Sequence, residues 1–204
     1  EDGERELATS LDLPGVGTRG RHHPHRHVAD ELAVEAVLDQ AGGDLGAGGD
    51  VEHPAVDKYD HSSLRFVIYA GAPMYREDQK AALNRLGPVL VQYFGLGEVT
   101  GDITVMPANL HEIEDGPQAR IGTCGFERTG MQVSIQGDDG RELKPFETGE
   151  ICVIGPAVFA GYYDNPEANA KAFRDGWFRT GDLGHMDEEG FVYITGRASD
   201  MYIS

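Results

Sequence analysis

Eight residue types are missing from the first fifty positions: Lys, Phe, Tyr, Ile, Asn, Met, Trp and Cys. A segment without aromatic residues and Ile has little apolar surface with which to offset the entropy lost on folding. At most one short helix is expected there, over residues 29–40, where apolar residues recur at roughly helical spacing. We therefore expect residues 1–51 to be a low-complexity segment that is disordered. The missing types mostly have AT-rich codons, so a non-native reading frame is a second hypothesis.

Two features of that segment resemble functional motifs. The histidines His22, His23, His25 and His27 are either a solvated tail, which is the commoner case, or a metal-binding tract. The glycine-rich run at residues 42–50 lacks the Lys, Ser or Thr of a phosphate loop, and its Asp residues would repel phosphate. We therefore do not assign phosphate binding to that run.

Basic residues are scarce in the whole chain, which has 17 Lys and Arg against 35 Asp and Glu and a net charge of −18. An acidic surface repels phosphate backbones and anionic headgroups, so neither nucleic acid nor an anionic membrane is an expected partner. No apolar run approaches the roughly 20 residues of a membrane helix, and no transmembrane segment is expected. The cysteines, Cys124 and Cys152, lack metal-site spacing and are expected to be free thiols of a cytoplasmic protein. The less favoured alternative is a disulfide between them.

A strand–helix–strand unit is predicted from residue 64 onward. Residues 64–69 are rich in strand formers, residues 75–86 in helix formers, and residues 89–93 in strand formers again. Gly87 and Pro88 end the helix. The two strands of such a unit are parallel, so the loops after them, at residues 71–73 and 94–98, meet at the edge where α/β sheets bind ligands. The alternative is that both loops are ordinary turns.

From residue 120 the pattern predicts a β-rich, largely antiparallel subdomain. Strands are expected at residues 150–154, 177–186 and 191–195. A helix is expected to begin after the capping residue Asn165, with Pro166 at its first position, and to end near Phe173. The expected fold is therefore α/β, with a partial parallel sheet followed by this subdomain.

The strand predicted at residues 177–186 contains Thr180-Gly181-Asp182, and both Gly and Asp are disfavoured in strands. The Asp182 carboxylate could accept two hydrogen bonds from a vicinal diol such as a ribose. The alternative is a bulge in which Asp182 only accepts hydrogen bonds from nearby backbone amides.

Taken together, residues 53–204 resemble the adenylate-forming (AMP-binding) superfamily of acyl-CoA synthetases, luciferases and peptide-synthetase adenylation domains. The acyl-CoA synthetase type is favoured because no carrier domain is attached. The resemblance rests on four motifs in order: Tyr69-Ala70-Gly71-Ala72-Pro73, residues 93–98 (YFGLGE), residues 149–151 through 161–167 (GEI and GYYDNPE), and residues 177–182 (WFRTGD) with Gly196-Arg197 after them.

The resemblance implies roles for residues of these motifs. Residues 71–73 would line an adenine pocket, Phe94 would stack on the base, and Glu98, the candidate catalytic residue, would hold Mg²⁺ beside the phosphates. Asp182 would bind the ribose hydroxyls. The full nucleotide-binding set is Gly71, Ala72, Pro73, Phe94, Gly95, Gly97, Asp182 and Arg197.

The implied reaction uses ATP, Mg²⁺ and coenzyme A, with a small-molecule carboxylic acid as substrate. The carboxylate attacks the α-phosphate of ATP to give an acyl-adenylate and pyrophosphate. The thiol of coenzyme A then takes the acyl group.

The chain also departs from the family pattern. Gly97 stands where the family usually has Thr, and Ser199 stands at the hinge position, where Asp or Lys is common. Neither the family's phosphate loop nor its C-terminal domain with a catalytic Lys can be recognised, so we expect this chain to be inactive alone. The alternatives are a non-catalytic nucleotide-binding or structural remnant, and an unfolded product. The expected division is residues 1–51, an α/β part at 52–118, and a β-rich subdomain at 119–204 that ends at the hinge.

Overall fold

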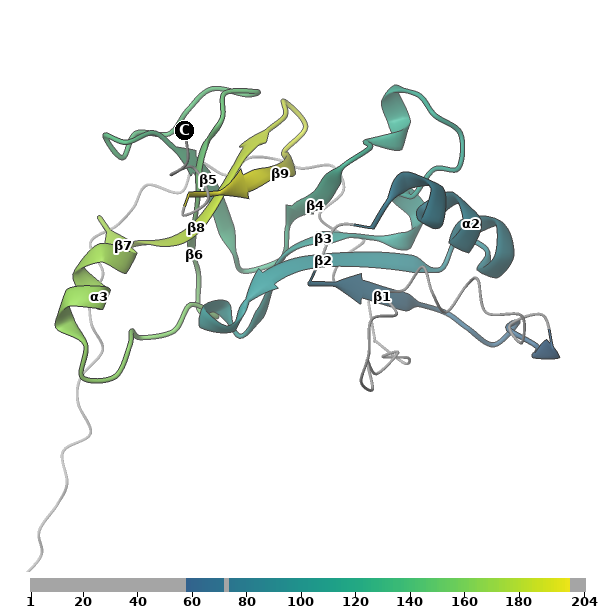
Figure 1. The fold of residues 1–204 in the computed structure, drawn as a ribbon, viewed down its shortest axis with the longest axis horizontal. Coiled ribbons are helices and arrows are strands. Elements are labelled where there is room, and N and C mark those ends of the chain that lie inside the picture. Colours follow the sequence, from purple (N-terminus) through teal and green to yellow (C-terminus); the bar gives the residue numbers. More distant parts are fainter. Residues whose placement is uncertain (1–57, 72–73, 199–204) are drawn as a thin grey trace, which may run out of the picture.

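The computed structural model of the chain describes residues 58–71 and 74–198 (Figure 1). The expectations for residues 1–51, for Ala72 and Pro73, and for Ser199 fall outside these ranges. No helix within them has the length and apolar character that crossing a membrane requires.

The described strands form one nine-stranded sheet in the order β1-β2-β3-β4-β9-β8-β6-β5, with β7 pairing to β8 (Figure 1). Strands β1 and β2 run parallel, and the other strand pairs are antiparallel. The expected fold class is confirmed. The strands are β1 Val67–Ala70, β2 Leu90–Leu96, β3 Gly101–Met106, β4 Thr123–Glu127, β5 Gln132–Gln136, β6 Gly149–Ile154, β7 Phe173–Arg174, β8 Trp177–Met186 and β9 Phe191–Arg197.

The predicted strand–helix–strand unit is formed by β1, helix α2 (Arg76–Leu86) and β2. Ala82 and Leu83 give α2 its buried face, which packs with Val67 and Leu90 of the two strands. The helix ends at Gly87, whose φ of 82° lies in the left-handed region and whose N–H donates to Leu83 O. The unit therefore arises from the sequence signals that predicted it.

Strand β2 is longer than predicted, because it continues through residue 96 as one arm of a hairpin with β3. Residues 94–96 were expected in a loop, and that expectation is wrong. The turn is a short 3₁₀ segment, η3 (Gly97–Val99), which holds only the last part of the predicted loop. A register shift between Phe94 and Gly95 bends the strand where the motif lies.

The second half of the chain follows the sequence signals closely. Helix α3 (Pro166–Ala172) begins after Asn165, whose Oδ1 accepts a hydrogen bond from Ala168 N at 3.1 Å. Strand β8 has the predicted bounds, and β9 continues two residues beyond its prediction, to Arg197. Two further 3₁₀ segments are η4 (Ala108–Leu110) and η5 (Pro117–Ala119).

The predicted division at residue 119 is not a break in the sheet. Strand β3 pairs with β4, which in turn pairs with β9, so strands from both sides of that position belong to one sheet. The division into an α/β part and a β-rich subdomain stays a prediction about folding units.

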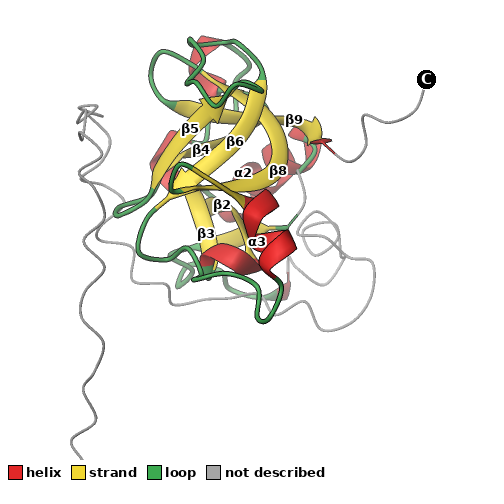
Figure 2. Cartoon of the chain, turned by 90° about the vertical axis from the view of Figure 1, so that its left-hand side faces the viewer, coloured by secondary structure: helices red, strands yellow, loops and turns green. Residues whose placement is uncertain are grey.

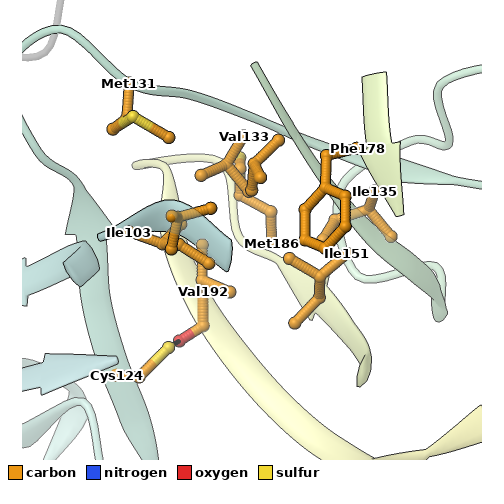
Figure 3. Close-up of a cluster of buried hydrophobic side chains, with 11 residues drawn as sticks. Ile103, Cys124, Met131, Val133, Ile135, Ile151, Phe178, Met186 and Val192 are labelled. Carbon is orange, nitrogen blue, oxygen red and sulfur yellow. Dashed lines mark hydrogen bonds between the residues drawn. The ribbon is translucent and has the colours of Figure 1, made fainter. Parts of the chain in front are cut away.

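The largest hydrophobic cluster lies inside the curve of this sheet. Its members include Ile103 on β3, Val133 on β5, Phe178 on β8 and Val192 on β9 (Figure 3). Because side chains from non-adjacent strands meet in one cluster, the sheet must curl around it, and the curvature is visible in Figure 2. The curled sheet fixes the position of β8 relative to the β2–β3 hairpin. Asp182 lies on β8, and Glu98 lies in the turn of the hairpin.

Candidate functional site

A surface pocket of about 330 Å³ lies at the carboxyl ends of the two parallel strands. The prediction that the segments after β1 and β2 meet at this edge is confirmed. Small residues dominate the pocket wall, so backbone atoms make much of its surface. The pocket is lined by Ala70, Gly71, Tyr93, Gly95, Leu96, Gly97, Gly101 and Asp102.

Three of the expected nucleotide-binding residues, Gly71, Gly95 and Gly97, share this pocket. Phe94 is placed differently: it is partly buried and packs against the main hydrophobic cluster. Successive side chains of a strand point to opposite faces. The preceding residue, Tyr93, lines the pocket, so Phe94 points to the other face of β2, toward the core.

Five residues of the pocket were not in the expected nucleotide-binding set: Ala70, Tyr93, Leu96, Gly101 and Asp102. A signal existed for Asp102, because an Asp in a strand is disfavoured and the same argument singled out Asp182. In the structure Asp102 pairs with Arg128, whose Nε lies 3.2 Å from Oδ2 and also donates to Asp102 O at 2.7 Å. The ion pair places a fixed carboxylate at the pocket wall.

Glu98 lies in η3 at the hairpin turn, next to the pocket residue Gly97. Its carbonyl oxygen accepts a hydrogen bond from Phe159 N at 2.7 Å, and its Oε1 accepts one from Tyr162 Oη at 3.0 Å. Within residues 58–71 and 74–198, only one oxygen of the Glu98 carboxylate has a hydrogen-bond partner. A single half-exposed carboxylate remains able to bind a cation.

A metal ion at Glu98 would need ligands from elsewhere. The described residues contain no group of three His, Cys, Asp or Glu side chains arranged to hold a metal. Mg²⁺ is commonly bound by one or two carboxylates together with substrate phosphates rather than by an all-protein cage. Glu98 therefore fits a metal that arrives with a phosphorylated ligand.

Asp182 sits in a bulge of β8 opposite Ile151. The register between β6 and β8 shifts between Cys152, paired with Arg179, and Glu150, paired with Leu183. Gly181 adopts a φ of 75° there, in the left-handed region that favours glycine. The bulge therefore turns the strand at the position that carries the carboxylate.

Hydrogen bonds hold the bulge in this shape. Thr180 Oγ1 donates to Ile151 O at 2.8 Å and accepts from Asp182 N at 3.1 Å. Glu150 Oε1 accepts from Gly181 N at 3.3 Å. Local backbone groups are thus satisfied by Thr180 and Glu150, not by the Asp182 carboxylate.

The Asp182 side chain is only 4% exposed and is half-paired. Its Oδ1 lies 2.9 Å from Arg197 Nε, on the neighbouring strand β9, while its Oδ2 is buried with no hydrogen-bond partner among the described residues. Burial raises the pKa of this carboxyl group, and the positive charge of Arg197 partly opposes that rise. A buried acceptor without a partner is unfavourable, and a ligand hydroxyl would satisfy it.

Asp182 and Arg197 lie together, as the predicted roles require, but they are not part of the pocket lining. The strand that carries Asp182 and the segment around Glu98 are connected by packed aromatic side chains. Phe159, whose N–H holds Glu98, packs edge-on against Phe178 with ring centroids 5.4 Å apart. Phe178 is on β8, the strand that carries Asp182.

Comparison with known proteins gives a family and a set of relatives. The model of the family described as AMP-binding enzyme matches residues 32–163. The match begins inside the segment 1–51 that was expected to be low-complexity.

Curated relatives are similar to the chain over three quarters of its length. The medium/long-chain-fatty-acid–CoA ligase FadD8 of Mycobacterium tuberculosis is 34% identical over 154 residues, which are 76% of this chain and 26% of that protein. The indoleacetate–CoA ligase of Aromatoleum aromaticum is 37% identical over 155 residues, 76% of this chain and 29% of that protein. The chain therefore spans less than a third of the length of these relatives.

Solved structures agree with this result. The amide bond synthetase McbA from Marinactinospora thermotolerans superposes with a TM-score of 0.68 at 34% identity, over 74% of this chain and 30% of that one. The O-succinylbenzoate coenzyme A synthetase of Bacillus subtilis, in complex with ATP and magnesium ion, superposes with a TM-score of 0.63 at 31% identity. That match covers 70% of this chain and 28% of the synthetase.

Proposed function

This chain belongs to the AMP-binding enzyme family, and we propose that it supplies the adenine, ribose and metal side of an ATP site in an acyl-CoA synthetase. The reaction of the whole enzyme would join a carboxylic acid to AMP and then to coenzyme A. The relatives named for fatty-acid and indoleacetate ligation support a carboxylic acid as the substrate class.

The observation that carries this proposal is the buried, unpartnered Oδ2 of Asp182 beside Arg197. A carboxylate accepts hydrogen bonds and cannot donate them, so the missing partner is a donor such as a ribose hydroxyl. Arg197 is more than half exposed and brings a positive charge to the same place. A nucleotide offers both a diol for the carboxylate and phosphates for the guanidinium.

The glycine-lined pocket and Glu98 would complete the nucleotide contacts. The backbone at Gly71, Gly95 and Gly97 lets a flat ring approach closely, and Tyr93, rather than Phe94, supplies the aromatic wall of the pocket. Glu98 would hold Mg²⁺, which when bound neutralises phosphate charge and polarises the reacting phosphoryl group. We also propose that Ala72 and Pro73 line the adenine pocket.

We propose that the chain acts in the cytoplasm and by itself holds nucleotide without completing catalysis. The buried free thiols of Cys124 and Cys152 suit a reducing compartment, where disulfides are rare. Burial raises the pKa of the Cys124 thiol to about 12, so it would not serve as a nucleophile. The acyl and coenzyme A contacts are assigned to parts of the enzyme beyond the described residues.

Replacing Gly97 with Thr is expected to strengthen ATP binding by about tenfold, roughly 1.4 kcal/mol. A Cβ at Gly97 meets no atom within 4 Å, and its φ lies outside the left-handed region, so the larger side chain fits. The new hydroxyl would donate to a phosphate, as the family's usual Thr implies. Calorimetric titration measures the change, and Gly97→Val is the matched control because it has the same shape without the hydroxyl. Equal affinities for the Thr and Val variants would refute the phosphate contact.

Titration of ATP with Mg²⁺ into the full chain tests the proposed function directly. ATP is expected to bind, and dideoxy-ATP, which lacks the ribose hydroxyls, is expected to bind at least about tenfold more weakly, because a lost hydrogen bond to a charged group is worth about 1.5–3 kcal/mol. Absence of ATP binding contradicts the proposal.

Acid-dependent exchange of pyrophosphate into ATP separates the two candidate functions. Binding without exchange supports a non-catalytic nucleotide-binding chain, whereas exchange would show that the chain catalyses the adenylation step on its own.

A further inference from the structure

The loop between β6 and α3 holds the segment around Glu98 at three positions. Phe159 N donates to Glu98 O at 2.7 Å, Tyr162 Oη donates to Glu98 Oε1 at 3.0 Å, and Thr100 Oγ1 donates to Ala157 O at 3.1 Å. Tyr162 and Glu98 are 64 positions apart in the sequence. The side-chain contact therefore depends on the fold and cannot be a local turn effect.

Tyr162 is itself fixed from behind by Asn169 of α3. The Asn169 side chain accepts from Tyr162 N at 2.7 Å and donates to Tyr162 O at 2.9 Å, so one amide group clamps both backbone polar groups of the tyrosine. Gly161, immediately before it, has a φ of 132° and lies close to Asn169, so the approach depends on glycine. The backbone of Tyr162 is thus set by helix α3.

The ring of Tyr162 is fixed as well. It packs edge-on against Phe159 with centroids 4.8 Å apart, and Phe159 packs against Phe173 and Phe178 of the core. A hydroxyl carried on a clamped backbone and a packed ring has little freedom. It is able to select one orientation of a carboxylate, whereas a free Glu side chain on a turn samples several.

We propose that Tyr162 is a positioning residue for Glu98: its hydroxyl holds one carboxylate oxygen and presents the other to a phosphate-bound divalent cation. This inference rests on the proposed function, because it assumes that Glu98 faces a metal–nucleotide ligand. Tyr162 touches neither nucleotide nor metal in this scheme. It acts by removing rotational freedom from Glu98, which preorganises the ligand set before the nucleotide arrives.

The test measures ATP affinity with and without Mg²⁺ in the full chain. The ratio of the two affinities is the coupling between metal and nucleotide. Tyr162→Phe removes only the hydroxyl and is expected to reduce this ratio about three- to tenfold, the range for loss of one hydrogen bond, while ATP affinity without Mg²⁺ stays unchanged. A purely structural role would lower both affinities alike.

Tyr163→Phe is the matched control, because Tyr163 is the adjacent tyrosine and is 98% exposed. It is expected to leave both affinities unchanged. Glu98→Gln is expected to reduce the Mg²⁺ ratio at least as much as Tyr162→Phe, and adding Tyr162→Phe to Glu98→Gln is expected to cause no further loss.

Each other outcome overturns the inference, and the pattern tells which assumption failed. If Glu98→Gln reduces the ratio but Tyr162→Phe does not, the metal role stands and positioning by Tyr162 is wrong. If Tyr162→Phe raises the ratio, the hydroxyl competes with the metal. If the unmodified chain binds no ATP, the proposed function and the inference fall together.

Discussion

Replacing Asp182 with Asn is expected to weaken ATP binding by about 1.5–3 kcal/mol, the value of hydrogen bonds to a charged group, while leaving the fold at least as stable as before. The carboxylate is buried, and its Oδ2 has no partner among the described residues. Under the proposed function this second oxygen accepts a hydrogen bond from a ribose hydroxyl, and the Asn side chain removes the charge. Calorimetric titration of ATP and denaturant unfolding measure the two effects in the same samples.

The stability part of this prediction has a defined pH dependence. The folded-state pKa of Asp182 is raised by burial, so the folded chain binds a proton more tightly than the unfolded chain. The carboxylate therefore disfavours folding above the raised pKa, and the penalty fades as the pH falls through it. The stability advantage of Asp182→Asn should be full above the raised pKa and should vanish below about 3.9, the ordinary pKa of Asp.

Asp138→Asn is the matched control for this pair of measurements. Asp138 is an exposed carboxylate of the turn after β5, and its substitution removes the same charge from the chain. It should change neither ATP affinity nor the free energy of unfolding by more than about 0.5 kcal/mol. Unchanged ATP affinity in Asp182→Asn would remove the ribose role, and equal losses in both variants would indicate a general charge effect.

Local signals predicted the elements that depend on local physics. The Asn165 cap with Pro166 predicted α3, and Gly87 predicted the end of α2, because caps and left-handed glycines act within a few residues. The bounds of β2 could not be predicted in the same way. Its last residues are strand because β3 pairs with them, and that pairing depends on a hairpin whose turn carries no Asn-Gly or Asp-Gly signal.

In the candidate site, too, the features set by local rules could be predicted, and the contacts between distant elements could not. The rule that parallel strands end at one edge of a sheet correctly predicted that Gly71 and Gly97 lie near each other. Which of Tyr93 and Phe94 lines that pocket depends on which face of β2 meets the core, and the core is assembled from distant strands. The link from Tyr162 to Glu98 likewise crosses the sheet. Contacts between distant elements were therefore the part that the sequence alone could not predict.

Replacing Gly95 with Ala is expected to disrupt the β2–β3 hairpin, a larger effect than any other substitution considered. A Cβ at Gly95 would lie 1.6 Å from Gly101 O and 2.6 Å from Asp102 Cα, so the clash is with backbone. Overpacking a core typically destabilises by about 1–3 kcal/mol when side chains can shift. Here a strand would have to move, so we expect a loss beyond that range or failure to fold, measured by denaturant unfolding and circular dichroism.

Gly97→Ala is the control for this effect, because Gly97 lies in the same pocket wall and a Cβ there meets no atom within 4 Å. The Gly97→Ala chain should fold with nearly unchanged stability. If the Gly95→Ala chain were equally stable, the close approach of Gly95 to the backbone of β3 would not be required. Gly95 lines the pocket, yet its lack of a side chain is already required by the approach of β3. A loss of nucleotide binding in Gly95→Ala would therefore report the hairpin, whereas a change in Gly97→Ala would report the ligand. Of the two glycines, only Gly97 can be used to measure what the pocket wall contributes to binding.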